Sequence, residues 1–476
     1  MMGFNTSRKV YESLPLMVKQ GLCLVPFSWW AGKAYRETFA RGSWFDRASR
    51  EELLHYQEQR LRKVLRFAVD QVPAYQHLRQ IVERLEPFET LKAFPLVDKD
   101  TLQANLANYL SRDFNRMPHY EVTTGGTGGN QLRFFVDDSS QAVETAFVHR
   151  CWARVGYTPR CKKATFRGVG FSKSANGLFW QHNPVYNELQ FSPFHMSETN
   201  LASYVQHLAK YCPQYLHGYP SAIDIFAEYV LRHGLQDALP QIKAAFLVSE
   251  GVTTDQRDRI EAAFRTRVFS FYGHSERVIF GGECERNSTY HQFPDYGYLE
   301  VIGENGLPCR SEGDRGELVG TGFLCRCMPL IRYRTGDYAT LLEPDCECDR
   351  KWDRFTDIEG RWKQDMLVGR TGARISLAAL NMHGPMFANV RRYQYYQDTA
   401  GECIIKMMVT DYFTENQSTC IRRAYEDKAG SEINFSVEIV DDMPLTERGK
   451  FKRLDARLSE QHTLCAGAFN GSMRQA

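Results

Sequence analysis

The hydrophobic pattern along the chain first predicts a long helix. Residues 49–85 place Leu, Val and Phe at helical spacing, and Ser49 precedes two glutamates, as expected for a helix N-cap. Pro73 falls inside this pattern, and its ring is expected to break the helix there.

The middle of the chain alternates helical and strand-like segments. These are helices at 199–212 and 219–234, strands at 215–218, 244–250 and 268–276, and a helix that Thr254 is expected to cap. Such alternation predicts an α/β sheet with parallel strands. Ligands bind at the carboxyl ends of parallel strands, and polar residues follow the last two strands of this region.

Short β runs separated by Gly and Pro occupy residues 296–340, and the pattern changes again after Gly360. We therefore expect an α/β fold in which a large N-terminal domain with a β-rich subdomain precedes a small, mobile α+β C-terminal domain. The expected divisions are an N-terminal segment at 1–48, the large domain at 49–360 with its β-rich subdomain at about 285–360, and the small domain at 361–476.

Composition agrees with several domains and narrows the class of protein. A chain of 476 residues is too long for one compact core. Its formal net charge of +2 excludes a dedicated nucleic-acid binder, which would be strongly basic. Thirteen cysteines, an odd number, in a chain without a secretion signal predict reduced thiols and a cytoplasmic location.

The apolar part of the N-terminal segment is interrupted by Lys19, Gln20 and Pro26, so it cannot span a bilayer. Two interpretations of its LCLVPFSWW stretch, residues 22–30, are open. In the first interpretation, the stretch lies peripherally on the inner face of a membrane, because Trp and Phe beside basic residues favour that interface. Alternatively, it docks on the main domain.

A stretch of small residues, VTTGGTGGNQ at 122–131, is the first candidate for chemistry. Glycines let backbone N–H groups converge on a phosphate, and threonine hydroxyls add donors. The alternative is a plain hairpin turn. No Gly-Lys-Ser/Thr follows, so this is not a Walker loop.

Later segments place further candidate groups in loops. In SFYGHSE, Tyr272 can stack on a purine and Glu276 can hold a divalent cation. In IRYRTGDY, Asp337 follows a Thr-Gly turn and can accept both hydroxyls of a ribose. Arg361 and Lys450 each follow a glycine. Taken singly, the structural interpretations are favoured: Tyr272 as a core aromatic residue, Asp337 as a turn former and Lys450 as a solvated charge.

The order of these segments resembles the adenylate-forming superfamily over roughly residues 60–455. Within it, the chain is most similar to the phenylacetate–CoA ligase branch, including CapK-type proteins associated with capsular polysaccharide biosynthesis. The supporting segments are VPAYQHLR at 72–79, PLVDKDTLQAN at 95–105, LHGYPSAI at 216–223 and PLIRYRTGD at 329–337.

The resemblance implies an ATP and magnesium site. The implied phosphate loop is Thr123, Thr124, Gly125, Gly126, Thr127 and Gly128. The implied adenine site comprises Ser249, Glu250, Gly251, Tyr272 and Gly273, with His274 and Ser275 in the same nucleotide-binding loop. Glu276 would bind magnesium, Asp337 and Arg361 the ribose, and Lys450 the phosphate oxygens during adenylation.

The same resemblance places the acyl pocket at Tyr215, His217, Gly218, Tyr219 and Pro220. His217 is more often a hydrogen-bonded structural histidine than an acid or base. Two departures from the family pattern stand out in the phosphate loop: Gly126 replaces a hydroxyl residue, and Asn130 stands at the proline position.

Four residues form a candidate metal site. Cys284 and His291 are separated by six residues, and Cys346 and Cys348 by one. Three thiolates and an imidazole suit tetrahedral zinc, and phenylacetate–CoA ligase relatives look similar here. The alternative is ordinary buried thiols. Cys325 and Cys327 form a second Cys-x-Cys, without a nearby histidine in the sequence, and are expected in the core.

The expected function is ATP-dependent activation of a carboxylic acid as an acyl-AMP. The acyl group then passes to coenzyme A, as in an acid–thiol ligase, or to a sugar amine or hydroxyl in surface polysaccharide assembly. One alternative is a degenerate nucleotide-binding scaffold in a polysaccharide complex, motivated by the altered phosphate loop. Another is a membrane-surface transferase, motivated by the N-terminal aromatic residues.

Overall fold

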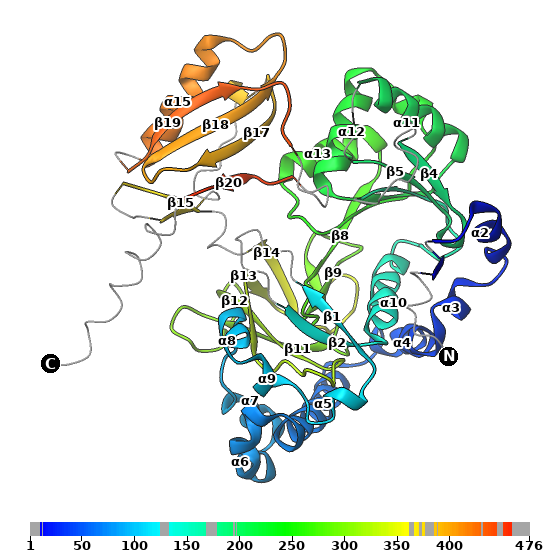
Figure 1. Ribbon diagram of the computed structural model, residues 1–476, viewed down its shortest axis with the longest axis vertical. Helices are drawn as coiled ribbons and strands as arrows, with labels where there is room; N and C mark the ends of the chain where they lie inside the picture. Colours follow the sequence, from blue (N-terminus) through cyan, green and yellow to red (C-terminus); the bar gives the residue numbers. More distant parts are fainter. Residues whose placement is uncertain are drawn as a thin grey trace. The chain divides into compact units, whose positions relative to one another are not determined.

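The computed structural model describes residues 10–11, 13–123, 133–167, 179–193, 196, 198–360, 366–370, 374–376, 385–387, 389–429, 432–444 and 451–458. The chain divides into two compact units, Met1–Gly360 and Arg361–Ala476 (Figure 1). The predicted site residues Thr124 to Gly128, Arg361 and Lys450 lie outside the described residues, as does the side chain of Thr123.

Unit 1 begins with helices. They are α2 (Leu16–Leu22), α3 (Phe27–Trp30), α4 (Gly32–Phe45), α5 (Arg50–Gln71), η1 (Pro73–Leu78), α6 (Arg79–Arg84), α7 (Pro87–Lys92), α8 (Lys99–Ala104) and α9 (Leu106–Tyr109). Ser49 caps α5 reciprocally: its hydroxyl accepts from Glu52 N at 3.2 Å, and its N–H donates to the Glu52 carboxylate at 2.7 Å. Pro73 ends the α-helical path and starts η1, so the prediction for this region is confirmed.

A mixed sheet of twelve strands runs through unit 1 in the order β11-β12-β13-β14-β10-β9-β8-β7-β6-β3-β5-β4. Its parallel part consists of β3 (Lys163–Phe166), β5 (Glu188–Phe191), β6 (Tyr215–Gly218), β7 (Ala244–Leu247) and β8 (Arg267–Gly273), with β4 (Trp180–Asn183) antiparallel at the edge. The predicted α/β sheet with parallel strands is confirmed.

Helices cover both faces of the parallel strands. Alternate strand residues point to opposite faces, so apolar side chains on each face pack against helices. Leu216 packs with α11 (Glu198–Tyr211), α12 (Pro220–Arg232) and α13 (Thr254–Phe264). Tyr215 packs on the other face, with α10 (Ser140–Ala153). The prediction that Thr254 caps α13 is wrong by one residue: the Thr253 hydroxyl accepts from Gln256 N at 3.3 Å, which makes Thr253 the N-cap.

The other half of the sheet is antiparallel. Its strands are β9 (Phe280–Glu283), β10 (Tyr290–Gln292), β11 (Gly297–Ile302), β12 (Arg315–Gly322), β13 (Tyr333–Leu342) and β14 (Arg354–Glu359). This is the β-rich region that the sequence predicts. Asp337 follows no turn, however: it lies inside β13, where the register with β12 shifts and Gly336 has φ +73°. A separate hairpin pairs β1 (His119–Thr123) with β2 (Arg133–Asp137).

Unit 2 is a small α+β fold. Its sheet has the order β19-β18-β17-β20, formed by β17 (Val390–Gln397), β18 (Glu402–Val409), β19 (Asn434–Ile439) and β20 (Leu454–Ala456). Helix α15 (Glu415–Ala429) packs on this sheet through Ile421 and Tyr425, and the Tyr425 hydroxyl lies 2.8 Å from that of Tyr395. A short hairpin of β15 (Met366–Val368) and β16 (Arg374–Ser376) belongs to the same unit.

Gly218 ends β6 where the chain has no space for a side chain. A Cβ at this position would lie 2.4 Å from the carbonyl oxygen of Phe166 in the neighbouring strand. We expect Gly218→Ala to lower the free energy of unfolding by about 1–3 kcal/mol, because overpacking forces the two strands apart. Urea denaturation would measure this. Gly21→Ala is the control, since a Cβ at Gly21 meets no atom within 4 Å; equal effects of the two substitutions would contradict the prediction.

Candidate active site and metal centre

Three neighbouring parallel strands end at one edge of the sheet. Gly218 of β6 pairs with Leu247 of β7, which pairs with Ser270 of β8. The segments that follow β6 and β7, beginning at Tyr219 and Val248, therefore emerge beside the last residues of β8, Phe271 to Gly273. This is the edge at which ligands bind in parallel α/β sheets.

Tyr272 and Asp337 meet directly at this edge, although 65 residues separate them. The Tyr272 hydroxyl donates to Asp337 Oδ2 at 2.7 Å. Burial and the nearby Asp337 carboxylate raise the pKa of Tyr272 well above its usual value, so this hydroxyl stays a proton donor. The backbone N–H of Asp337 donates to the Thr335 hydroxyl at 3.1 Å, which fixes the residue further. These two contacts hold Asp337 in one orientation at the edge of the sheet.

Glu276 is buried between two side chains. Its Oε1 accepts from the Tyr333 hydroxyl at 2.7 Å, and its Oε2 lies 3.1 Å from His274 Nδ1. These contacts orient the carboxylate. The residues present thus fit a magnesium ion, which takes one or two protein carboxylates and completes its shell with water and phosphate.

Glu250 supports the first turn of α12. Its carboxylate accepts from Ser221 N at 3.1 Å and lies 3.2 Å from the Ser221 hydroxyl, near the positive end of the helix dipole. Ser249, immediately before it, has φ +70°. A Cβ at Gly251 would meet no atom within 4 Å. The loop after β7 therefore leaves space beside Gly251 while Glu250 ties it to α12.

The predicted acyl-pocket residues divide between this edge and the core. Tyr219 is the N-cap residue of α12 and Pro220 its first residue, both directly after β6. Tyr215 lies at the other end of β6, and its hydroxyl donates to Val155 O at 3.0 Å. His217 is buried with its ring 4.9 Å from Trp152, and burial lowers its pKa well below the usual value. A neutral ring packed against Trp152 suits a structural role for His217.

Arg277 is a residue of this edge that the sequence did not single out. Its guanidinium donates to the Tyr120 hydroxyl at 3.2 Å and to Gln141 Oε1 at 3.1 Å. It thereby joins the loop after β8 to β1, the strand that leads into the predicted phosphate loop, and to α10. Arg277 has a φ of +58°, and no local sequence signal predicts this backbone conformation. Only the structure reveals the link to Tyr120 and Gln141.

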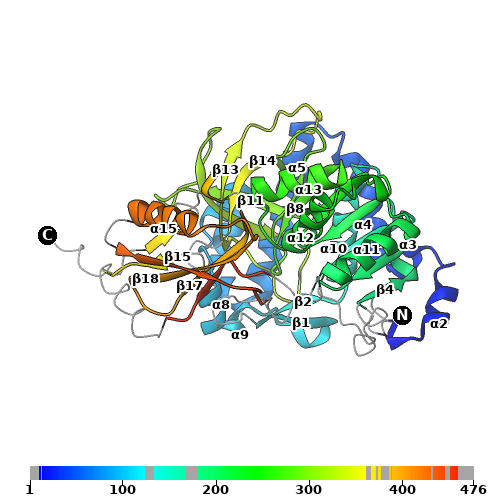
Figure 2. The ribbon, with the colours of Figure 1, turned by 90° about the horizontal axis from the view of Figure 1, so that it is seen from above.

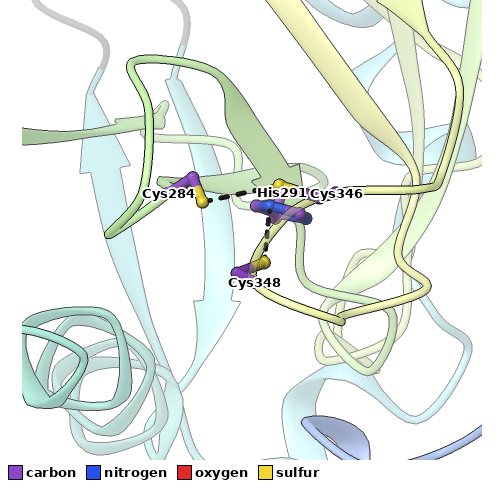
Figure 3. A group of neighbouring side chains, drawn as sticks. All are labelled: Cys284, His291, Cys346 and Cys348. Carbon is purple, nitrogen blue, oxygen red and sulfur yellow. Dashed lines mark hydrogen bonds between the residues drawn. The ribbon is translucent and has the colours of Figure 1, made fainter.

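The four predicted metal ligands come together (Figure 3). Cys284 follows β9, His291 lies in β10, and Cys346 and Cys348 belong to the loop between β13 and β14. Their ligand atoms all lie within 4.8 Å of one another. Cys284 Sγ is 3.6 Å from Cys346 Sγ, and His291 Nε2 is 3.4 Å from Cys348 Sγ. Tetrahedral zinc bonds of about 2.0–2.3 Å separate such ligands by about 3.5–3.8 Å.

The surroundings of the cluster shift the pKa values of its members in different directions: a hydrogen bond with Cys348 and burial raise the pKa of the Cys284 thiol. Burial lowers the pKa of His291, which keeps its imidazole neutral. Hydrogen bonds from Cys284 and His291 lower the pKa of the Cys348 thiol. Backbone and side-chain N–H groups also point at sulfur: Arg286 N lies 3.3 Å from Cys284 Sγ, and Asn287 Nδ2 lies 3.5 Å from Cys346 Sγ. The cluster can therefore hold zinc, as the sequence predicts.

The second Cys-x-Cys pair has a partner that the sequence did not indicate. Cys327 is buried, Cys325 is half-buried, and Asp137 at the end of β2 lies beside both. Asp137 Oδ1 accepts from Cys327 N at 2.8 Å and from Arg326 N at 3.1 Å. These bonds tie the loop to the β1–β2 hairpin and direct the carboxylate at the backbone.

Comparisons with known proteins agree with this geometry. Residues 367–455 match the model of the CapK C-terminal domain. Protein CapK of Staphylococcus aureus is 26% identical over 76% of this chain and 79% of its own length. Phenylacetate-coenzyme A ligase of Thermus thermophilus is 26% identical over 67% of this chain and 73% of its own. The crystal structure of 2-hydroxyisobutyryl-CoA ligase in the postadenylation state superimposes with a TM-score of 0.64 at 20% identity, covering 87% of this chain and 92% of that one.

The fold and these similarities point to one class of protein: the chain is similar to the adenylate-forming, acyl-activating enzymes. Within that superfamily it is similar to CapK and the phenylacetate–CoA ligases.

Proposed function

We propose that the protein is an ATP-dependent, AMP-forming ligase that activates a carboxylic acid as an acyl-adenylate and transfers the acyl group to a second substrate. The observation that carries this proposal is the pairing of Tyr272 with Asp337 beside the buried Glu276, at the edge where β6, β7 and β8 end. Residues far apart in sequence come together there and supply the polar groups that nucleotide binding requires.

The first half-reaction exchanges one bond on phosphorus for another. A carboxylate oxygen of the acid attacks the α-phosphorus of ATP, the bond to the bridging oxygen breaks, and pyrophosphate leaves with the electron pair. Asp337 would hold the ribose hydroxyls while Tyr272 keeps Asp337 in place. Magnesium bound at Glu276 would supply charge neutralisation on the phosphates.

The second half-reaction passes the acyl group to an acceptor nucleophile, and AMP leaves. Coenzyme A is one acceptor, as the names of the phenylacetate–CoA ligase relatives suggest. A sugar amine or hydroxyl in surface polysaccharide assembly is the other, as the CapK relative suggests. We also propose that the Cys284 cluster holds a structural zinc, since it supplies four protein ligands and no open position.

ATP–pyrophosphate exchange, measured with a broad panel of carboxylic acids, tests the first half-reaction. At least one acid is expected to support exchange. Asp337→Ala should reduce exchange at subsaturating ATP by about 10–100-fold, because hydrogen bonds to a charged group contribute about 1.5–3 kcal/mol. Asp113→Ala is the matched control, since the Asp113 carboxylate is half exposed and faces Arg116.

The outcomes separate the enzyme from the scaffold alternative. Exchange with no acid of the panel, by folded protein that still binds ATP in calorimetry, would contradict the proposal and favour a nucleotide-binding scaffold. Equal loss of exchange in Asp337→Ala and Asp113→Ala would remove Asp337 from the site.

A further inference from the structure

The beginning of the chain concentrates exposed apolar side chains. Among the described residues, thirteen large hydrophobic side chains are exposed, and eight of them lie between Val10 and Trp44. These eight are Val10, Met17, Val18, Leu24, Val25, Trp29, Phe39 and Trp44. Exposed apolar residues scattered singly are normal in soluble proteins, whereas a concentration of them marks an interaction surface.

This segment is folded against unit 1. Phe27 and Tyr35 are buried in a cluster with Ala142 and Ala146 of α10. The Tyr11 hydroxyl donates to Asn183 Oδ1 at 2.5 Å and accepts from Val185 N at 3.4 Å. The docked interpretation of the N-terminal stretch thus holds for these residues. Docking holds the rest of the segment in place, and α2 stands at the outer edge of unit 1 in both views (Figures 1 and 2).

The side chains that do not dock are exposed to an unusual degree. Met17 of α2 is 83% exposed, Leu24 in the connection to α3 is 85% exposed, and Trp29 of α3 is 73% exposed. Phe27, two residues before Trp29, is only 8% exposed. Some side chains of the segment therefore anchor it, while other apolar side chains are exposed to solvent.

The same segment carries the positive charge of the chain. Residues 1–45 contain six basic side chains and only two acidic ones, Glu12 and Glu37, which gives a net charge of +4; residues 10–45 alone contain four basic side chains and carry a net +2. Since the whole chain carries +2, residues 46–476 carry a net −2. An otherwise slightly acidic protein thus begins with a basic, apolar segment.

We propose that residues 10–45 bind the surface of an anionic phospholipid bilayer and hold the enzyme there peripherally. Trp and aliphatic side chains partition into the headgroup region, and neighbouring Lys and Arg are attracted to anionic lipids. In the part of the chain that the structure describes, every helix is too short or too polar to cross a bilayer, which agrees with contact in the plane of the surface. This membrane contact is independent of acyl activation and of the acceptor.

Vesicle co-sedimentation of the full-length protein tests the proposal. Binding is expected to vesicles that mix phosphatidylglycerol with phosphatidylcholine, and to weaken when salt is raised from about 0.05 to about 0.5 M, because salt screens the charge attraction. The triple variant Met17→Ser/Leu24→Ser/Trp29→Ser should bind at least about tenfold more weakly. The control triple Leu85→Ser/Leu307→Ser/Tyr412→Ser removes exposed apolar side chains elsewhere and should bind as the wild type does.

Several outcomes would overturn the proposal. One is no binding to anionic vesicles; another is equal binding by the two triple variants. A third is self-association without vesicle binding. If gel filtration shows concentration-dependent self-association, and the Met17→Ser/Leu24→Ser/Trp29→Ser variant abolishes it, the exposed apolar side chains bind a second copy of the chain. Thermal unfolding of both variants should match the wild type because the substituted side chains are exposed. ATP–pyrophosphate exchange, measured in parallel, reports separately on the proposed function.

Discussion

Replacing Lys450 with alanine is expected to lower the rate of acyl-adenylate formation by about 10²–10³-fold. Negative charge builds on the phosphoryl oxygens as the carboxylate attacks, and a lysine ammonium placed beside them stabilises that charge. Lys450 is assigned this role by its place in the segment MPLTERGKFKR, residues 443–453. Pyrophosphate release at saturating ATP, with an acid that supports exchange, measures the effect.

The second half-reaction provides an internal control. A synthetic acyl-adenylate of the same acid bypasses the step in which phosphoryl charge develops, so Lys450→Ala should still transfer its acyl group to the acceptor at close to the wild-type rate. Lys452→Ala is the matched variant, because Lys452 lies two residues away and pairs with Asp455 at 3.3 Å. Unchanged pyrophosphate release in Lys450→Ala, or an equal loss in Lys452→Ala, would contradict the assignment.

Apart from the Cys284–His291–Cys346–Cys348 cluster, which the family resemblance suggested, the features that the sequence predicted correctly are those with local signals. Ser49 and Glu52 form a capping box because the spacing alone brings their groups together. The parallel strands follow from short apolar runs between helices. The prediction failed by one residue where two neighbouring residues both suit an N-cap. Thr253 and Thr254 are both suitable, and Thr253 is the N-cap because it forms a capping box with Gln256.

Contacts between distant residues had no such signal. The Tyr272–Asp337 bond spans 65 residues and the Arg277–Tyr120 bond spans 157, and only the folded sheet brings these groups together. The family resemblance placed Tyr215 in the predicted pocket beside Gly218; in the structure Tyr215 begins β6, at the opposite end of the strand from Gly218, and its hydroxyl donates to Val155 O.

One partner in the site was accessible from the sequence. Tyr333, which donates to Glu276, lies four residues before Asp337, and Thr335, whose hydroxyl accepts from Asp337 N, lies two before it. Residues at this spacing share one face of a strand. Treating IRYRTGDY as a strand with a bulge rather than as a turn would have drawn Tyr333 into the site with Asp337.

Loss of the Cys284–His291–Cys346–Cys348 cluster is expected to have the largest effect on stability. Elemental analysis of the purified protein should find one zinc per chain. Cys348→Ser should release it and lower the melting temperature of unit 1 by about 4–7 °C, which corresponds to about 3–5 kcal/mol for a unit of this size. The zinc would cross-link the β9–β10 hairpin to the loop between β13 and β14, so its loss removes a tie beside the direct pairing of β10 with β14.

A matched substitution distinguishes lost coordination from a lost thiol. Cys309→Ser replaces another half-buried cysteine, which lies outside the cluster, and should retain the zinc and change the melting temperature little. Acidification should also release zinc, because protons compete for the thiolates and for the imidazole of His291. If the protein contains no zinc after purification without chelators, or if Cys348→Ser and Cys309→Ser melt alike, the four residues are ordinary buried thiols and an imidazole. The antiparallel half of the sheet would then depend on its apolar core alone.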